Sequence, residues 1–524
     1  MYDAAGTLVW CPHNLVARSG DASDAVWTKN GVSVAGTTIT VTATGGSKSI
    51  SQWVGGAPDG PVTLCLRVRA GASSMVSLGL YSGGFVAATA SVLSGPGVVS
   101  GTGLIQVTGL SAGTQTVIVL QATAPAGGIG VFVYPGGDTT GANVVGDSVE
   151  FDDIRLNVGA LQPYYPTTSA AYYGPRLTYD PVTHAALGLL VEEQRTNLLT
   201  YSGALDNAAI TKSNSSVVAA SATAPDGTLT GFKLREDSTA SADHRIYWTV
   251  TTTAVGHVLS VFAKAAERSW MYLRMDRSGG GTPRVWFDLA NGVVGTAETG
   301  TSGAITSVGG GWYRCSLILD TAAVASVNPL IGITTANGAT AYSGDGSSGI
   351  YVWGAQLEAG AFATSYIPTG AASATRAADV VTCTGAAFSQ WFNSADGTLL
   401  VEFTQSQNSA ARYILAGDNA STRIAYGYAN DPALYAYDGA HLLTYGNSVV
   451  GANKLAFAYS AGQMAGSLNG GATVTAVANG NFAAMTVLKV GEEASGLVFL
   501  NGTIKRVRYW RKRLTNAQLQ ALTA

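Results

Sequence analysis

The chain has 524 residues, of which 12% are charged and 66 are glycine, and its net charge is −3. Because about 25% of residues are charged in a typical soluble domain, this low fraction, with abundant glycine and few helical patterns, indicates an all-β protein with many turns. The absence of a basic cluster argues against nucleic-acid binding, and no apolar run approaches the roughly 18 to 20 residues that a membrane-spanning helix needs.

Residues 1–12 are the first feature along the chain, and we interpret them as an N-terminal arm. The arm has aromatic rings at Tyr2 and Trp10 and ends at Cys11 and Pro12. We expect it to dock on a neighbouring subunit. Its start has neither the basic region nor the apolar core of a signal peptide, so we expect synthesis in the cytoplasm without one.

The four cysteines, Cys11, Cys65, Cys315 and Cys383, are widely separated and form no Cys-x-x-Cys pair. A zinc site is therefore not expected. Cys65 and Cys315 lie in apolar runs typical of strands, which predicts that both are buried free thiols.

A sequence signature near the start of the chain occurs a second time. Asn14 and Lys29 recur as Asn197 and Lys212, each 183 positions further along, with apolar and threonine neighbours repeated. Such spacing predicts a duplicated unit. Between the copies, prolines and glycines interleaved with aromatic residues indicate an ordered connector. The predicted segments are the arm 1–12, unit one 13–168, the connector 169–195, unit two 196–370 and unit three 371–524.

Both repeated units consist of short runs of β-forming residues separated by Gly, Ser, Asn or Asp. The runs 116–120 and 312–319 are typical, and no helical pattern separates them. This spacing favours antiparallel β-sandwiches over βαβ units, and we predict tandem jelly rolls.

The third unit does not repeat the first two. Its last predicted strand, 502–510, has one basic face, and Thr515 with Gln518 forms a capping-box pattern. A short C-terminal helix is therefore predicted over 516–522.

Three segments of the chain resemble tailed-bacteriophage structural proteins that carry carbohydrate-binding-module-like jelly rolls. The segments are LLVEEQRTNL at 189–198, YVWGAQLE at 351–358, and TSYIPT at 364–369 leading into TRAAD at 375–379. The third unit is similar to concanavalin-A-like or laminin-G-like sandwiches, on the strand 502–510 that leads into 514–519. The resemblance implies a lectin-like β-sandwich with a short C-terminal helix in this unit.

The resemblance implies a non-enzymatic protein on a virion surface, such as a tail fibre, an appendage or a capsid fibre. Its partners would be other virion proteins and host cell-surface glycans, without nucleic-acid binding or membrane insertion. Low charge and many small residues suit close packing in a homo-oligomer such as a trimer. Two alternatives stay open: a capsid or tail decoration protein that mainly packs on virion subunits, and a polysaccharide depolymerase.

Unit three contains the candidate glycan site. A sugar ring stacks its CH face on an aromatic ring, while amides and carboxylates bind its hydroxyls. Alternation places Tyr435 and Tyr437 on one strand face. The alternative is that these rings only fill a sheet face or a subunit interface. The candidate residues are Tyr426, Tyr428, Asn430, Asp431, Tyr435, Tyr437, Asp438 and His441.

Unit two contains a second aromatic group, for which core packing is the alternative interpretation. Its members are Tyr247, Trp270, Tyr272 and Trp286.

Acidic residues suggest only a structural calcium ion, and no other cofactor is expected. The candidate ligands are Asp147, Glu150, Asp152 and Asp345. The adjacent carboxylates at 152–153 and 192–193 would point to opposite faces of a strand, so neither pair suits glycoside cleavage.

Overall fold

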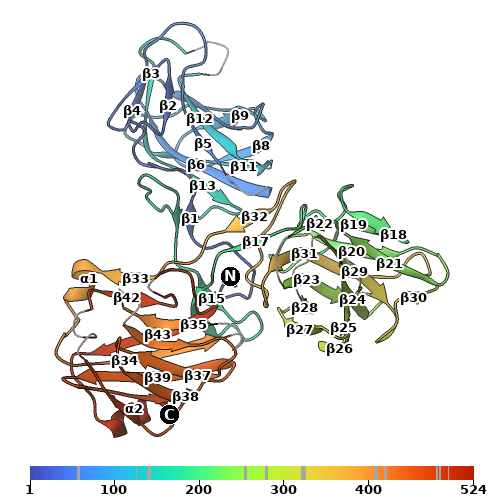
Figure 1. The fold of residues 1–524 in the computed structure, drawn as a ribbon. Helices are drawn as coiled ribbons and strands as arrows, with labels where there is room; N and C mark the ends of the chain where they lie inside the picture. Colours follow the sequence, from blue (N-terminus) through green and yellow to red (C-terminus); the bar gives the residue numbers. More distant parts are fainter. Residues whose placement is uncertain are drawn as a thin grey trace.

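A computed structural model shows three β-sandwiches arranged around a central junction (Figure 1). It describes residues 1–55, 60–125, 127–137, 143–252, 256–277, 281–319, 326–405, 411–417, 422–479, 482, 485–493 and 495–524. The predicted all-β class is confirmed, since antiparallel ladders build every sheet and the described helices are short. None of the helices in these residues is long and apolar enough to cross a membrane.

The first sandwich consists of two six-stranded sheets packed face to face. Alternate strand positions are apolar, so Val131 and Val133 of one sheet share a buried core with Ile118 and Leu120 of the other. We name the two sheets after a central strand of each. The β12 sheet contains, in spatial order, β2 (Thr28–Asn30), β5 (Ser49–Val54), β12 (Ile129–Pro135), β7 (Met75–Tyr81), β10 (Ile105–Thr108) and β9 (Val98–Ser100). The β6 sheet contains β3 (Val32–Ala35), β4 (Thr38–Val41), β13 (Ser148–Val158), β6 (Gly60–Ala70), β11 (Thr116–Ala124) and β8 (Ala88–Ser94).

The second sandwich has the same two-sheet plan around its own core. Its β29 sheet contains β18 (Thr211–Ser213), β21 (Ala242–Tyr247), β29 (Ser326–Thr334), β24 (Trp270–Arg277), β25 (Arg284–Asp288) and β26 (Val293–Ala297), with β22 (Val250–Thr251) on β29 and β30 (Ala341–Tyr342) on β21. Its β31 sheet contains β19 (Ser215–Ala222), β20 (Gly231–Glu236), β31 (Gly349–Ala359), β23 (His257–Ala265), β28 (Trp312–Leu319) and β27 (Thr301–Ser307).

The first two sandwiches share the same polar contacts at their chain entry. The Asn14 side chain accepts the backbone N–H of Leu156 at 3.2 Å, and Asn197 accepts that of Leu357 at 3.1 Å. The Ser19–Tyr164 and Ser202–Tyr366 hydroxyl pairs, at 3.0 and 2.9 Å, also match. The order along the chain differs for three strands at the sheet edges. In the first sandwich the chain forms β8 and β9 before β10, which lies beside β7. In the second it forms β25, which lies beside β24, before β26 and β27. The two sandwiches thus share their entry contacts, as a duplication predicts, but the chain runs through the edge strands in the opposite order.

The third sandwich combines a seven-stranded sheet and a six-stranded sheet. Helix α2 (Asn516–Thr523) has the predicted capping box of Thr515 and Gln518, and its Leu519 packs on the outer side of the larger sheet. Helix α1 (Gly385–Ser389) directly follows strand β33 (Thr382–Thr384). The β34 sheet contains β15 (Leu177–Tyr179), β16 (Ala186–Val191), β43 (Gly502–Trp510), β34 (Gly397–Gln405), β39 (Gly451–Ser460), β40 (Gln463–Leu468) and β41 (Val474–Val477). The β36 sheet contains β33 (Thr382–Thr384), β42 (Val487–Val490), β35 (Arg412–Ala416), β36 (Arg423–Gly427), β37 (Ala433–Tyr437) and β38 (Leu442–Asn447).

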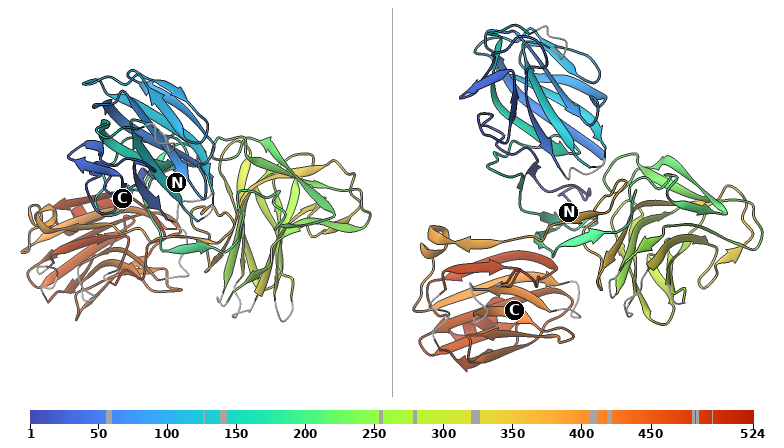
Figure 2. Two further views of the ribbon diagram at one scale, coloured as in Figure 1. Left: turned by 90° about the horizontal axis from the view of Figure 1, so that it is seen from above. Right: turned by 45° about the horizontal axis from the view of Figure 1, so that its top comes forward.

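The connector predicted at 169–195 belongs in large part to the third sandwich. Its apolar run at the end of β16 pairs with β43, with Leu189 opposite Ile504. The second sandwich is therefore an insertion between β16 and β33 of the third sandwich. The chain enters and leaves it through a two-stranded ladder of β17 (Arg195–Asn197) and β32 (Ala374–Arg376), which we call the neck (Figure 2).

The N-terminal arm docks on the second sandwich of its own chain, and its expected contact with a neighbouring subunit stays a prediction. Tyr2 and Leu8 form an isolated antiparallel bridge and pack beside Phe262, Trp312 and Trp353 of the second sandwich. A further ladder, β1 (His13–Asn14) with β14 (Tyr172–Tyr173), closes the base of the first sandwich. All four cysteines are free, and Cys65 and Cys315 are fully buried as predicted.

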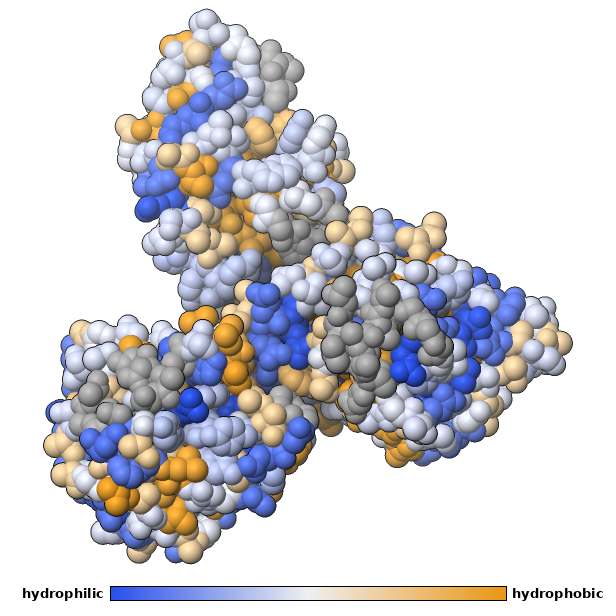
Figure 3. Space-filling view, in the orientation of Figure 1, coloured by the Kyte–Doolittle hydropathy of each residue, from blue (hydrophilic) through white to orange (hydrophobic). Residues whose placement is uncertain are grey.

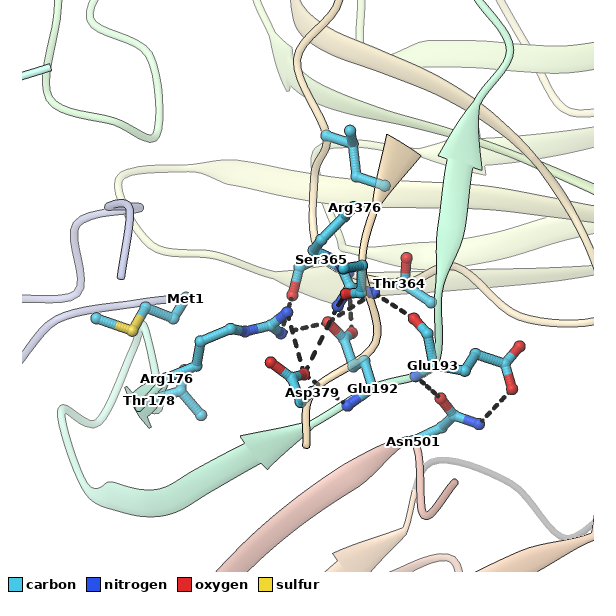
Figure 4. A network of polar contacts seen from close by, with 12 residues as sticks. Met1, Arg176, Thr178, Glu192, Glu193, Thr364, Ser365, Arg376, Asp379 and Asn501 are labelled. Carbon is cyan, nitrogen blue, oxygen red and sulfur yellow. Dashed lines mark hydrogen bonds and ion pairs between the residues drawn. The ribbon is translucent and has the colours of Figure 1, made fainter. Parts of the chain in front are cut away.

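A cluster of charged side chains lies at the base of the neck (Figure 4). The Glu192 carboxylate contacts Arg176 and lies 3.4 Å from Arg376, and Asp379 lies 3.4 Å from Arg176 and 3.6 Å from Arg376. The backbone N–H of Ser365, from the second sandwich, donates to Glu192 at 2.9 Å. These contacts join the connector, the inserted sandwich and the start of the third sandwich.

The charge state of Glu192 is set by its partners. Burial by itself raises the carboxyl pKa, but Arg176, Arg376 and the Ser365 hydrogen bonds outweigh it and lower the pKa to about 2. Beside it, Asn501 of the third sandwich exchanges two hydrogen bonds with Glu193 at 2.9 and 3.0 Å. Glu192 is therefore ionised at neutral pH, and the cluster is linked to both neighbouring sandwiches.

We predict that Glu192→Gln destabilises the chain by roughly 3 to 5 kcal/mol at pH 7, because it leaves two buried guanidinium groups with one carboxylate. The folded pKa of about 2 lies below the usual 4.5, so the stabilisation is complete above pH 4.5 and is lost as the pH falls towards 2. Urea unfolding midpoints at pH 7 and pH 3 test this. The matched control, Glu267→Gln, removes a half-exposed carboxylate paired with Lys233 and should change stability little. A difference between Glu192→Gln and wild type that stays constant down to pH 2 would contradict the assignment.

Candidate functional site

The outer face of the β36 sheet carries a group of tyrosines. Strand alternation turns Leu434 and Ala436 into the core, and it turns Tyr435 and Tyr437 outwards. Tyr413 and Tyr426 lie on the same outer side. In the view of Figure 3, hydrophobic residues are interspersed with hydrophilic ones on all three sandwiches. The face of the β36 sheet is defined here by the contacts between its rings.

The solvent-facing part of this group lies at the hairpin between β36 and β37. Tyr428 is 48% exposed, and its ring centroid lies 5.3 Å from that of Tyr435. Asp431 accepts the Tyr435 hydroxyl at 2.7 Å, which raises the pKa of Tyr435 and lowers that of Asp431. Asn430 is exposed at the turn with a φ of 57°. The hairpin thus places two rings beside an amide and a carboxylate, and we call these four residues the hairpin site.

A buried arginine beneath the hairpin fixes its shape. The Arg412 guanidinium donates to the carbonyl oxygens of Tyr428 at 3.2 Å, Asp431 at 2.9 Å and Ala433 at 3.4 Å. It also donates to the side chains of Gln405 and Ser448, at 3.1 and 3.2 Å. Because a guanidinium has five donors in a rigid fork, these bonds order the turn before any ligand arrives.

A second arginine occupies the middle of the tyrosine face. The Arg423 guanidinium carbon lies 5.0 Å from the ring centroid of Tyr426 and 5.7 Å from those of Tyr413 and Tyr437. Tyr426 is only 2% exposed, and burial together with its hydroxyl contact to Tyr428 raises its pKa. Tyr426 therefore supports its neighbours and does not offer a ring face to solvent.

The remaining two predicted residues lie at the opposite end of β37. Asp438 is buried and accepts the backbone N–H groups of Ala440, His441 and Asn479, at 3.0, 2.7 and 2.6 Å. These bonds outweigh burial and lower its pKa. The His441 ring lies 3.2 Å from Asp438. This pair shapes the β37–β38 turn and is separate from the hairpin site.

The four calcium candidates do not converge on one site. Asp147 accepts the Val144 N–H at 2.7 Å, Asp152 pairs with Arg69 at 2.8 Å, and Glu150 lies on the same strand as Asp152. Asp345 lies in the second sandwich, where it accepts the N–H groups that follow it. Among the residues that the structure describes, no group of three or more Asp, Glu, His or Cys is arranged to hold a metal ion.

The aromatic group predicted in unit two does assemble, on the outer face of the β29 sheet, but it is closed. Tyr272 and Trp286 are buried with ring centroids 6.1 Å apart, and Tyr247 and Trp270 pack beside them. Arg274 covers this face through ion pairs with Asp243 and Asp276. This group therefore packs like a core, which is the alternative interpretation given in the sequence analysis.

One aromatic face was missed by the sequence analysis. Trp53, Tyr81, Phe85 and Phe132 come together on the outer face of the β12 sheet. In β5, β7 and β12 an aromatic residue alternates with core residues, and this alternation in the sequence could have indicated an outward-facing ring on each strand. Their separation over 79 positions hid the group until the sheet was formed.

A groove beside the neck offers no comparable platform. Its charged groups are engaged, since Arg195 contacts Glu193 at 2.5 Å and lies over the Phe362 ring at 4.7 Å. The groove is lined by Glu193, Gln194, Arg195, Thr196, Leu198, Thr251, Thr252 and Ala359. We assign it to the neck.

Comparison with known proteins gives no match to a family model, and it gives no match to a curated protein. Among solved structures, the chain is similar to the CBM40 of Ruminococcus gnavus IT-sialidase bound to α2,3-sialyllactose, at 17% identity over 25% of this chain and 85% of that chain, with a TM-score of 0.21. It is also similar to the CBM22-1–CBM22-2 tandem of Paenibacillus barcinonensis Xyn10C, at 10% identity over 68% of this chain and 100% of that chain, with a TM-score of 0.21. Domains LG4-5 of the mouse laminin α1 chain match at 11% identity over 57% of this chain and 94% of that chain, with a TM-score of 0.20. Similarities at this level do not identify a ligand or a site in this chain.

We predict that Arg412→Met destabilises the third sandwich by about 3 kcal/mol, because it leaves several buried carbonyl groups without a donor. Chemical unfolding followed by tyrosine and tryptophan fluorescence measures the loss. Arg506→Met is the matched control, since Arg506 is 45% exposed in its pair with Glu402 and should contribute less than about 1 kcal/mol. Equal effects of the two substitutions would show that Arg412 does not organise the hairpin.

Proposed function

We propose that this protein is a non-enzymatic glycan-binding protein and that the hairpin site of the third sandwich contacts the sugar. The observation that carries the proposal is the pair of rings, Tyr428 and Tyr435, held 5.3 Å apart beside Asn430 and Asp431 over the buried Arg412. An aromatic platform with a few polar groups is the arrangement that sugar rings need.

The chemistry of the hairpin site fits recognition better than cleavage. Asp431 accepts the Ala433 N–H at 2.9 Å on one oxygen and the Tyr435 hydroxyl at 2.7 Å on the other, which fixes the carboxylate in the turn and leaves one lone pair on each oxygen for a sugar hydroxyl. Glycoside hydrolysis requires two carboxyl groups on opposite sides of the scissile bond. Asp438, at the other end of β37, is buried in a turn.

We further propose that the protein acts on a bacteriophage virion surface in host attachment. The support is the resemblance carried by 189–198, 351–358 and 364–379. A single shallow site of this size binds weakly, and many copies on one particle would raise avidity without new contacts. Protein mass spectrometry and labelling of purified particles should then detect the chain in the virion, exposed to antibody. Its absence from particles would remove the attachment role while leaving glycan binding to be judged separately.

We predict that Tyr428→Ala with Tyr435→Ala lowers glycan affinity at least tenfold, because the variant removes the stacking surface; tenfold corresponds to about 1.4 kcal/mol. Full-length protein on a glycan array, followed by titration of each positive glycan, measures this. Tyr173→Ala removes a tyrosine that is 61% exposed elsewhere and serves as the matched control.

Three results, two from this binding experiment and one from a reducing-end assay, would contradict the proposal. Unchanged binding by the double variant would move the site elsewhere. Silence of the wild-type protein on every glycan would favour the decoration role. Release of reducing ends from host polysaccharide would favour a depolymerase.

A further inference from the structure

The outer face of the β12 sheet in the first sandwich presents an aromatic surface that the proposed function does not use. Trp53 is 57% exposed and lies opposite Gly130, whose other neighbour across the sheet is Tyr81. In the next row, Phe132 lies between Ser51 and Gly79. The two glycines therefore leave room for rings to lie against the sheet.

The rings fill that room in an ordered way. A side chain at Gly130 would meet the Phe132 ring at 2.9 Å, and one at Gly79 would meet the Phe85 ring at 2.7 Å. The Tyr81 centroid lies 5.5 Å from both Phe85 and Phe132. Both glycines are thus needed for the rings to approach the strands. The rings of Tyr81, Phe85 and Phe132 form one cluster, and the exposed Trp53 lies next to it, beside Gly130.

The polar groups of this face are uncharged. Ser51 and Gln106 are half-buried on it, and the buried Ser77 hydroxyl points to it without a hydrogen-bond partner among the described residues. All residues of the six strands are described, and those that point outwards include no Asp, Glu, Lys, Arg or His. Aromatic rings interleaved with hydroxyls and amides, without charge, suit a neutral sugar and do not suit an acidic one.

The second sandwich provides an internal comparison. Leu64 of β6 pairs with Leu156, and Leu259 of β23 pairs with Leu357, so Leu64 and Leu259 occupy equivalent positions. The turn from β6 to β7 has the same length as the turn from β23 to β24. Residues of β7 and β24 that are 195 positions apart therefore correspond. Gly79 and Tyr81 then correspond to Arg274 and Asp276, which form an ion pair at 2.8 Å across the closed face. The duplicated positions have diverged, with charge and closure in one copy and neutral exposed rings in the other.

We propose that the outer face of the β12 sheet is a second saccharide site, selective for neutral sugars and independent of the hairpin site. Trp53 provides the stacking ring, with Tyr81 and Phe132 extending the platform. The hydroxyl of Ser51 and the amide of Gln106 supply hydrogen bonds to sugar hydroxyls. The inference stands whether or not the hairpin site binds a glycan.

The test uses the full-length Tyr428→Ala/Tyr435→Ala chain, in which the hairpin site is removed. Affinity electrophoresis in gels containing neutral polysaccharides (xylan, mannan, β-glucan and dextran) or acidic ones (polygalacturonate and chondroitin sulfate) measures binding. We expect retardation by at least one neutral polysaccharide, a loss of tenfold or more on adding Trp53→Ala, and no selective retardation by the acidic ones. Adding Tyr81→Asp, which copies the second sandwich, should weaken binding similarly.

Leu93→Ala on β8 of the opposite sheet, where Leu93 is 63% exposed, is the matched control and should bind like its parent. Unfolding midpoints of all variants separate a lost site from a lost fold. Absence of retardation by every neutral polysaccharide, unchanged binding with Trp53→Ala, or preference for the acidic polysaccharides would each overturn the inference. Because Trp53→Ala in the wild-type background should leave the hairpin-site signals intact, the two sites can fail separately.

Discussion

The arrangement of this molecule depends on a buried carboxylate held between two guanidinium groups. Glu192 follows β16 directly, where the chain leaves the third sandwich for the neck, and Arg376 and Asp379 lie where the chain returns. Charges taken out of water in this way require partners on every side, and here the partners come from the connector, the inserted sandwich and the returning strand. The cluster thus holds together the entry and the exit of the insertion. Arg176 also ties it to the segment that leads from the first sandwich.

Away from this cluster, the outer sheet faces of the first and third sandwiches carry groups of aromatic side chains. The hairpin site is ordered from below by Arg412, and the β12 face is ordered by glycines that admit rings close to the strands. The β29 face of the second sandwich is closed by ion pairs, and its opposite sheet receives the N-terminal arm beside Trp312 and Trp353. In the inserted sandwich the rings of Tyr272 and Trp286 are therefore buried, whereas each of its neighbours exposes an aromatic ring, Trp53 in the first sandwich and Tyr428 in the third.

Local patterns in the sequence predicted the parts of the fold that depend on local physics. Alternation and turn residues gave the all-β class, and the spacing of Thr515 and Gln518 gave the C-terminal helix with its capping box. Asn14 and Asn197 marked equivalent positions that make equivalent hydrogen bonds. The pairing of β16 with β43 was missed because its partners are more than 300 residues apart and neither strand carries a local signal of its partner.

The candidate site was predicted in part for a related reason. Tyr428, Asn430, Asp431 and Tyr435 meet because one hairpin brings neighbours in sequence together. Asp438 and His441 are equally close in sequence, but the length of β37 carries them to the opposite end of the strand. Burial of Tyr426 under Arg423 and its ring neighbours, likewise, depends on side chains from several strands and has no local signal.

Excision of the inserted sandwich tests the nested architecture most directly. Thr196 and Thr375 are opposite each other in the neck ladder, with their hydroxyls 2.8 Å apart, so an Asn-Gly turn can join them in a chain that lacks 197–374. The account predicts that this chain unfolds cooperatively and keeps glycan binding at Tyr428 and Tyr435, whereas a fragment of residues 377–524, without β15 and β16, is much less stable. A folded, ligand-binding 377–524 fragment together with an unfolded excised chain would contradict it.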